Sequence, residues 1–321
     1  IPMAEIVPQS ITVLLVSDQY SLFFSLLILF TTLITALLAK GYLHDRAGEN
    51  EEFYLLLILS ALGALILVSA THLVSFFLGL ELLGVALYAL IAYPERGHLS
   101  LEAAIKYLVL SGAASAILLF GFAMIYAALG TLSFAGIGQQ LAQLSTQPLQ
   151  ADTQLLIMMG TAMVFTGVGF KLSLVPFHMW TPDVYQGAPS PVTGFLATVS
   201  KGAIFAALMR LFIDAQLYQY QGLMVGLSVL AVASMLVGNL LALKQSNLKR
   251  LLAYSSIAHL GYLFITLIVY GVLQQPALAV EAAGFYLTAY IITSLAAFSL
   301  LSIISSNTNG VEVDDISQIR G

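Results

Sequence analysis

Long apolar segments alternate with short polar stretches along almost the whole chain. A bilayer core about 30 Å thick requires a run of about 20 apolar residues in a helix that crosses it. Nine segments meet this length: 20–40, 53–70, 72–92, 101–129, 154–180, 190–213, 221–243, 249–271 and 277–304. The pattern therefore predicts an all-α integral membrane protein, a multi-span bundle of about nine helices.

Two of the stretches depart from a simple span. Pro176 and Pro182 fall close together in the segment 154–180, and proline removes a backbone donor and clashes with the preceding turn. We expect a broken helix there, with two half-helices joined by a short unwound stretch. The segment 131–152 contains no basic residue, and its amphipathic start predicts a helix that lies along the membrane surface.

The basic residues predict the orientation of the bundle, because lysine and arginine gather on the cytoplasmic side of membrane proteins. With nine spans, Arg210 is the only basic residue in the connections of one side. Eight fall on the other side: Lys40, Arg46, Arg96, Lys106, Lys244, Lys249, Arg250 and Arg320. We expect residues 1–19 outside the cytoplasm, residues 20–305 as a single transmembrane domain and residues 306–321 as a cytoplasmic tail or loop.

Composition supports the same class and excludes several kinds of chemistry. The chain is 60% hydrophobic and only 8% charged, whereas soluble domains carry about 25% charged residues. It has no cysteine, which excludes iron–sulfur clusters, c-type haem and disulfides within it. We find no phosphate-binding loop, no convincing metal spacing and no basic, aromatic-rich patch for nucleic acid. We expect no cofactor and no metal in this chain.

Three ionisable residues lie inside apolar spans. Glu81 is about nine residues, or about 13 Å, from the start of its span, and Lys201 is about 15 Å after Pro191. Lys171 lies just before Pro176. A charge at the bilayer centre costs on the order of 3 kcal/mol or more. Glu81 and one lysine could form a purely structural ion pair that locks two helices together. Lysine can lose and regain a proton where arginine cannot, so we favour proton transfer through Glu81, Lys171 and Lys201.

Weaker candidates accompany these three. In the eighth span a polar stripe with helical spacing is formed by Ser255, His259, Tyr262 and Thr266. His259 fits either a proton relay or helix packing. Lys106 begins a series that continues with Tyr107, Ser111 and Ser115, and it could relay protons or anchor its helix at the interface. His178 lies in the unwound stretch, where backbone must line a cavity or be buried in protein. Around Lys201, polar and small residues share its face: Thr193, Ala197 and Ser200.

A resemblance to a known family covers nearly the whole chain. The stretch GFKLSLVPFHMWTPDVYQGAPSPVTGFLATVSK, residues 169–201, resembles the signature of the antiporter-like subunits of respiratory complex I. FLGLELLGVALYALIAY and SNLKRLLAYSSIAHLGYL match the same family. Within it the N-type subunits are the most similar, because a lysine stands in VSKGAIF where some related subunits carry a histidine.

The resemblance implies a role for each candidate. Glu81 would be the carboxylate that pairs with Lys171 at the broken helix, and Lys201 would be the central lysine of a hydrophilic axis. Lys106 would be a further member near the cytoplasmic side, and His259 would belong to the second of two inverted repeats. The chain would hold the third to eleventh of fourteen helices, as an internal piece of a longer polypeptide. A second broken helix with another key lysine would follow it.

The resemblance also implies partners and a location. The chain would be a proton-translocating membrane subunit of a bacterial NADH:quinone oxidoreductase in the inner membrane, with residues 1–19 on the periplasmic side. Its partners would be other membrane and peripheral subunits, which would hold NAD, FMN, quinone and the iron–sulfur clusters. Two alternatives stay open: a subunit of a multi-subunit Na⁺/H⁺ antiporter or membrane-bound hydrogenase, and a purely structural membrane scaffold.

Overall fold

The computed structural model describes residues 7–44, 50–93, 98–144, 151–273, 276–306 and 314–319. Within this part, nine helical rods are long and apolar enough to cross a membrane. Eight of them are single helices: α1 (Gln19–Leu43), α2 (Glu51–Val68), α3 (Leu73–Ala92), α4 (His98–Leu129), α6 (Ala151–Lys171), α10 (Gln221–Ala242), α11 (Leu248–Leu273) and α12 (Pro276–Ser306). The other rod consists of three consecutive pieces: α8 (Ser190–Phe195), a π-helical turn (Leu196–Ser200) and α9 (Lys201–Asp214). The prediction of an all-α membrane bundle is confirmed.

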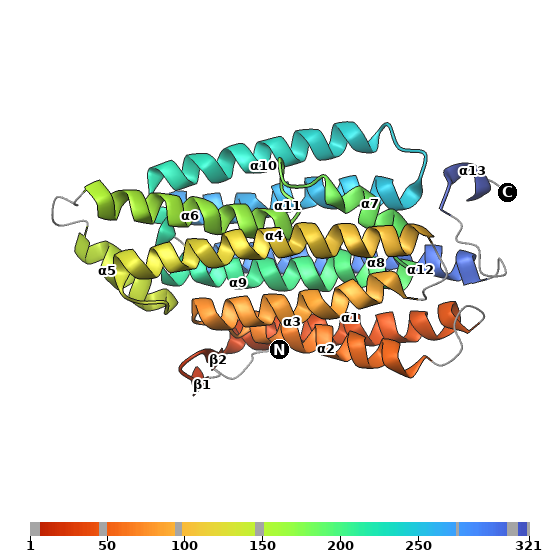
Figure 1. Cartoon of the computed structure of the whole chain (residues 1–321), viewed down its shortest axis with the longest axis horizontal. Helices are drawn as coiled ribbons and strands as arrows, with labels where there is room; N and C mark the ends of the chain where they lie inside the picture. The colour runs from red at the N-terminus through yellow and green to blue at the C-terminus, as the bar shows by residue number, and fades with distance from the viewer. Residues whose placement is uncertain are drawn as a thin grey trace.

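The shorter elements connect the rods or cover their ends. They are the antiparallel strands β1 (Gln9–Thr12) and β2 (Leu15–Ser17), α5 (Phe134–Leu144), α7 (Trp180–Gly187), the 3-10 helix η2 (Leu217–Gln219) and α13 (Ile316–Ile319). The predicted amphipathic segment forms α5, which buries its apolar face at helical spacing and lies across one end of the bundle (Figure 1).

The long rods run side by side along the bundle, with successive connections at alternate ends (Figure 1). The α8–α9 rod is the central one, since 94% of the residues in its apolar 18-residue stretch are buried, against 22% in the corresponding stretch of α10. Small residues let the helices around it approach closely, as is usual in membranes. A Cβ on Gly121 of α4 would lie 2.8 Å from the carbonyl oxygen of Gly160 on α6. This contact fixes the two helices that frame the first candidate site.

The predicted break between Pro176 and Pro182 exists, but neither proline ends the helix. The helix α6 ends at Lys171, and Ser173 then adopts a left-handed backbone with φ 62°. Ser173 N–H donates to the Phe170 carbonyl, and Leu174 N–H donates to the Gly169 carbonyl. These two bonds form a Schellman motif that terminates the helix. Pro182 lies in the first turn of α7, where a proline is tolerated.

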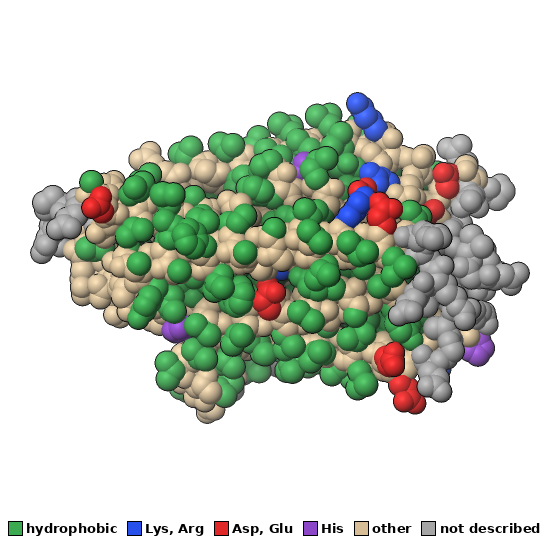
Figure 2. Space-filling model, in the orientation of Figure 1, with side chains coloured by type: hydrophobic (Ala, Val, Ile, Leu, Met, Phe, Trp, Pro, Cys, Tyr) green, Lys and Arg blue, Asp and Glu red, His purple; other side chains and the backbone are tan. Residues whose placement is uncertain are grey.

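The two ends of the bundle differ in their number of basic residues. The described basic residues Lys40, Lys106, Lys244, Lys249 and Arg250 belong to the same end, which we call the basic rim, whereas Arg46, Arg96 and Arg320 lie outside the described residues. On the face shown in Figure 2, apolar side chains cover most of the surface and the visible basic side chains gather at one end. The β1–β2 hairpin lies at the opposite end (Figure 1).

Candidate functional site

The first site joins the end of the broken helix to α3. Lys171 is the last residue of α6, and its Nζ lies 3.7 Å from Oε1 of Glu81 on α3. The Lys171 side chain is only 2% exposed, whereas that of Glu81 is 28% exposed. The carbonyl end of α6 favours a cation at this position. The structure therefore brings together the two residues predicted to pair.

Two serines of α4 complete this Glu81–Lys171 site. Lys171 Nζ donates a hydrogen bond to Ser111 Oγ, which also accepts one from the Tyr88 hydroxyl at 2.7 Å. Ser115 Oγ donates to Glu81 Oε1. Ser111 and Ser115 are four residues apart and therefore lie on one face of α4. The site is thus an ion pair of a buried lysine and a half-buried carboxylate, each of which contacts a hydroxyl group from a third helix.

Lys106 lies away from this site, at the basic rim. Its Nζ is 2.6 Å from Glu102 Oε1 and 3.0 Å from Asp183 Oδ2, and its side chain is 41% exposed. Arg250 of α11 donates to the other oxygen of Asp183 at 2.7 Å. Burial raises the pKa of Asp183, but the hydrogen bonds from Arg250 and Lys106 outweigh it, so the pKa lies below its ordinary value. This geometry fits an anchor that ties α7 to α4 and α11.

The second site surrounds Lys201, which is 1% exposed at the start of α9. Its Nζ donates to Ser256 Oγ of α11 at 2.7 Å and lies 5.3 Å from the centre of the Tyr185 ring. The Tyr290 hydroxyl of α12 lies 2.7 Å from Ser256 Oγ and 3.1 Å from the carbonyl oxygen of Ala197. Lys201 Nζ and the Tyr290 hydroxyl both donate to Ser256 Oγ, so Ser256 connects the lysine of α9 to the tyrosine of α12.

The π-helical turn before Lys201 changes which neighbours meet it. Thr193 Oγ1, on the predicted face, lies within hydrogen-bond distance of backbone carbonyls around the start of α8, such as that of Pro189 at 3.0 Å. Ala197 contributes its carbonyl oxygen within the π turn. Such turns are rare and often occur at functional sites.

The residues of the stripe predicted on α11 make separate contacts, and the serine that meets Lys201 is not one of them. Ser256, rather than Ser255, contacts Lys201. Thr266 Oγ1 instead donates to the Leu263 carbonyl of its own helix. His259 Nδ1 lies 2.7 Å from the Tyr286 hydroxyl, and its ring centre is 5.2 Å from that of Tyr290. His259 therefore adjoins the Lys201 site through tyrosines of α12 that sequence reasoning missed. The sequence did mark these tyrosines, because Tyr286 and Tyr290 stand four residues apart, on one helix face, in an apolar span.

The unwound stretch after α6 and the first turn of α7 hold buried polar atoms that have no hydrogen-bond partner among the described residues. They are Ser173 Oγ, both ring nitrogens of His178, and Thr181 Oγ1 of α7. Ser173 and Thr181 are fully buried, and His178 is 6% exposed. Buried polar groups in proteins are nearly always hydrogen-bonded, to protein or to ordered water. The predicted site residue His178 is thus placed in a polar, buried break in the helix.

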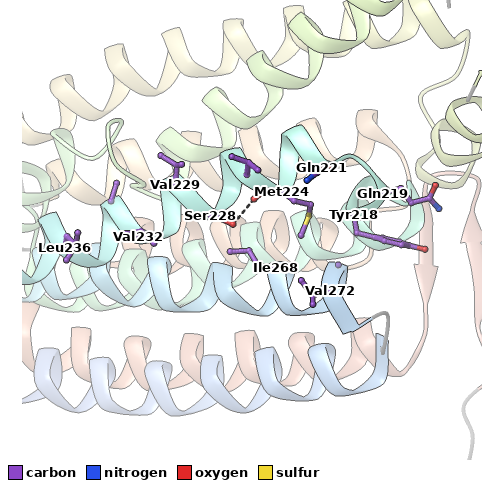
Figure 3. A pocket seen from close by; sticks show the side chains of 13 residues that line it. Tyr218, Gln219, Gln221, Met224, Ser228, Val229, Val232, Leu236, Ile268 and Val272 are labelled. Atoms are coloured by element: carbon purple, nitrogen blue, oxygen red, sulfur yellow. Dashed lines mark hydrogen bonds between the residues drawn. The ribbon is translucent and has the colours of Figure 1, made fainter. Parts of the chain in front are cut away.

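The large grooves of the molecule lie elsewhere, on its outer surface. One of about 790 Å³ runs along α10 and α11, with Val229, Val232 and Leu236 along its length and Tyr218 and Gln219 at one end (Figure 3). Another, of about 940 Å³, lies between α1 and α12. Neither is lined by Glu81, Lys171 or Lys201. The lysine sites are packed among helices, which suits a proton better than a larger substrate.

Comparison with known proteins identifies the family. The family described as NADH:quinone oxidoreductase/Mrp antiporter, transmembrane, matches residues 70–321. This chain belongs to that family. The matched region contains both lysine sites and the unwound stretch between them. Among the described residues, no group of three or more His, Asp or Glu side chains could hold a metal ion.

Solved structures of family members have the same fold. A chain of respiratory complex I from Thermus thermophilus with bound aureothin is 39% identical, with a TM-score of 0.74 over 92% of this chain and 60% of that one. A chain of the membrane-bound sulfane sulfur reductase, an archaeal respiratory membrane complex, is 27% identical, with a TM-score of 0.75 over 93% and 58%. A chain of the Mrp complex from Dietzia, 23% identical with a TM-score of 0.74 over 91% and 52%, shares the fold. The chain thus spans about three-fifths of the length of the first of these relatives.

Proposed function

We propose that this chain is the proton-translocating N subunit (NuoN) of a bacterial NADH:quinone oxidoreductase in the inner membrane. The observation that carries the proposal is the ion pair of half-buried Glu81 with buried Lys171, at a distance of 3.7 Å, at the end of a broken membrane helix. The similarity to a complex I chain from Thermus thermophilus at 39% identity favours complex I over the other assemblies of the family. The cofactors NAD, FMN, quinone and iron–sulfur clusters would belong to partner subunits.

In the proposed mechanism, quinone reduction in other subunits shifts the Glu81–Lys171 pair between a close and a separated arrangement. The proton on Lys171 then moves to Lys201. Water at the buried polar groups of Ser173, His178 and Thr181 would carry the proton over part of the distance between the two lysines. His259, whose Nδ1 lies 2.7 Å from the Tyr286 hydroxyl, would exchange protons with Lys201 by way of water, Tyr290 and Ser256.

The test uses the whole complex in proteoliposomes. Lys171→Met should leave the complex assembled and should lower the number of protons pumped per NADH oxidised. Wild-type pumping would overturn the proposal. If proton movement depended on sodium and not on NADH or quinone, the chain would belong to a multi-subunit Na⁺/H⁺ antiporter instead. If the variant lost only assembly, with normal pumping in the complexes that form, a structural scaffold would be the better account.

A further inference from the structure

Lys249 is a third buried lysine, besides Lys171 and Lys201, and the mechanism above does not use it. It is the second residue of α11, at the basic rim, and it is 0% exposed. Lys244, five residues earlier in the connection before α11, is exposed. The N-terminus of a helix carries a partial positive charge and disfavours a cation. Burial and position therefore both raise the free-energy cost of a charged lysine here, and a lysine that only determined membrane orientation would not need to be buried.

The amine of Lys249 is held by the end of another helix. Lys249 Nζ donates to the carbonyl oxygen of Ala188 at 2.7 Å, directly after α7 ends. Thr193 Oγ1 lies 3.2 Å from the same oxygen. The carbonyl end of a helix favours a nearby cation. Lys249 is therefore positioned where α7 ends and α11 begins.

This position lies between the rim and the Lys201 site. The next residue, Arg250, contacts Asp183 at 2.7 Å and Gln186 at 3.1 Å, both on α7. Ser256, which accepts the hydrogen bond from Lys201, follows Lys249 by two helical turns, or about 10 Å. The contacts of Arg250 with α7 and the contact of Ser256 with Lys201 are therefore made by the same helix, α11.

We propose that Lys249 is a proton relay that transfers protons between the basic rim and the Lys201 site. It would take a proton from water at the rim and pass it inward through Ser256, with water bridging the remaining gap. The proposal rests on the proposed function, since it supplies the same Lys201 site. The competing account is structural: Lys249 only caps the end of α7 through the Ala188 carbonyl.

The substitution Lys249→Arg separates the two accounts. Arginine keeps the charge and can donate to the Ala188 carbonyl, but it does not release its proton. A structural role predicts normal pumping in this variant. A relay role predicts an assembled complex that pumps about tenfold more slowly. A positioned proton-transfer group contributes about 100-fold or more, and water would replace part of that contribution in the variant. Lys244→Arg is the matched control at an exposed lysine and should pump normally.

Lys249→Gln keeps a donor for the Ala188 carbonyl and cannot titrate, so it repeats the test without the larger guanidinium. The initial rate of NADH-driven proton pumping is measured in proteoliposomes and normalised to assembled complex. Slow pumping in both Lys249 variants supports the relay. Wild-type pumping in either, or loss of assembly in both, overturns it. If Lys171→Met is impaired while Lys249→Arg pumps normally, only this inference fails; if Lys171→Met also pumps normally, the proposed function fails with it.

Discussion

The two lysine sites differ in what surrounds the amine. Lys171 has a carboxylate, Glu81, at 3.7 Å. Lys201 contacts Ser256 Oγ and the Tyr185 ring, and among the described residues no carboxylate lies within ion-pair distance of it. One site therefore stores a pair of opposite charges, while the other is lined by groups that can accept one proton and donate another.

This difference suggests a division of labour. A buried ion pair is sensitive to the distance between its members, because attraction is strong and desolvation is costly in a low dielectric. The hydroxyl groups around Lys201 carry no charge, and each can accept one proton and donate another. We therefore propose that the Glu81–Lys171 site stores charge and that the Lys201 site passes protons. The substitutions below test that assignment, ordered by their expected effect.

The largest effect should come from Glu81→Gln, which leaves Lys171 buried without its counter-ion. We expect proton pumping to fall about 100-fold. The free energy of unfolding should fall by about 2 kcal/mol, a value reduced for the partial exposure of Glu81. Proteoliposome pumping and thermal denaturation of the complex measure the two effects.

The double variant Glu81→Gln with Lys171→Met tells the two effects apart. Removing both charges should restore most of the stability, because no unpaired buried charge remains. Pumping should stay low. Recovery of pumping together with stability would mean that the pair only holds α3 and α6 together.

A smaller effect is expected for Ser256→Ala, which removes the hydroxyl between Lys201 and Tyr290. Pumping should fall about tenfold, since water can occupy part of the space and partly replace the relay. Ser255→Ala is the matched control, because the neighbouring serine does not make the contact to Lys201 and its substitution should leave pumping unchanged. Equal effects of the two substitutions would contradict the hydroxyl chain.

The smallest effect concerns the rim, where Asp183 joins Lys106 and Arg250. Its pKa is lowered, mainly because the hydrogen bonds from Arg250 and Lys106 outweigh the effect of burial. The ionised form is therefore the stabilising one: its contribution is present above the ordinary carboxylate pKa and is lost as the pH falls through the lower, folded-state pKa. Asp183→Asn should cost about 1 kcal/mol, as for a half-exposed ion pair.

Denaturation of wild type and Asp183→Asn as a function of pH measures this contribution. The difference in stability should be constant between pH 6 and 8, because Asp183 stays ionised throughout that range. It should shrink only when the pH falls below about 4, near the ordinary aspartate pKa. A difference that disappears between pH 6 and 8 would contradict the assigned protonation state.

The membrane helices could be predicted from the sequence because a bilayer imposes a length and an apolar composition on each span. The predicted segments 221–243 and 249–271 agree with α10 and α11 to within two residues at each end. The end of α6 could not be predicted in the same way. It depends on the left-handed backbone of Ser173, which a serine rarely adopts and no pattern of prolines reveals.

Parts of the candidate site were predictable for a related reason. Glu81 and Lys171 stand out because ionisable residues are rare in apolar spans. Ser256 and Tyr290 do not stand out, since their roles depend on the rotation of α11 and α12 about their axes and on the π-helical turn before Lys201. Lys249 follows a polar connection and matches the pattern of a topology-setting lysine, so only its burial in the folded chain distinguishes it.

The most direct test of the account is proton pumping by the complex that carries Lys201→Arg. Arginine keeps the positive charge and the capacity to donate to Ser256, but it does not release a proton. The account predicts an assembled complex in proteoliposomes that pumps fewer protons per NADH oxidised than wild type. An assembled complex with the wild-type number of protons per NADH would contradict it.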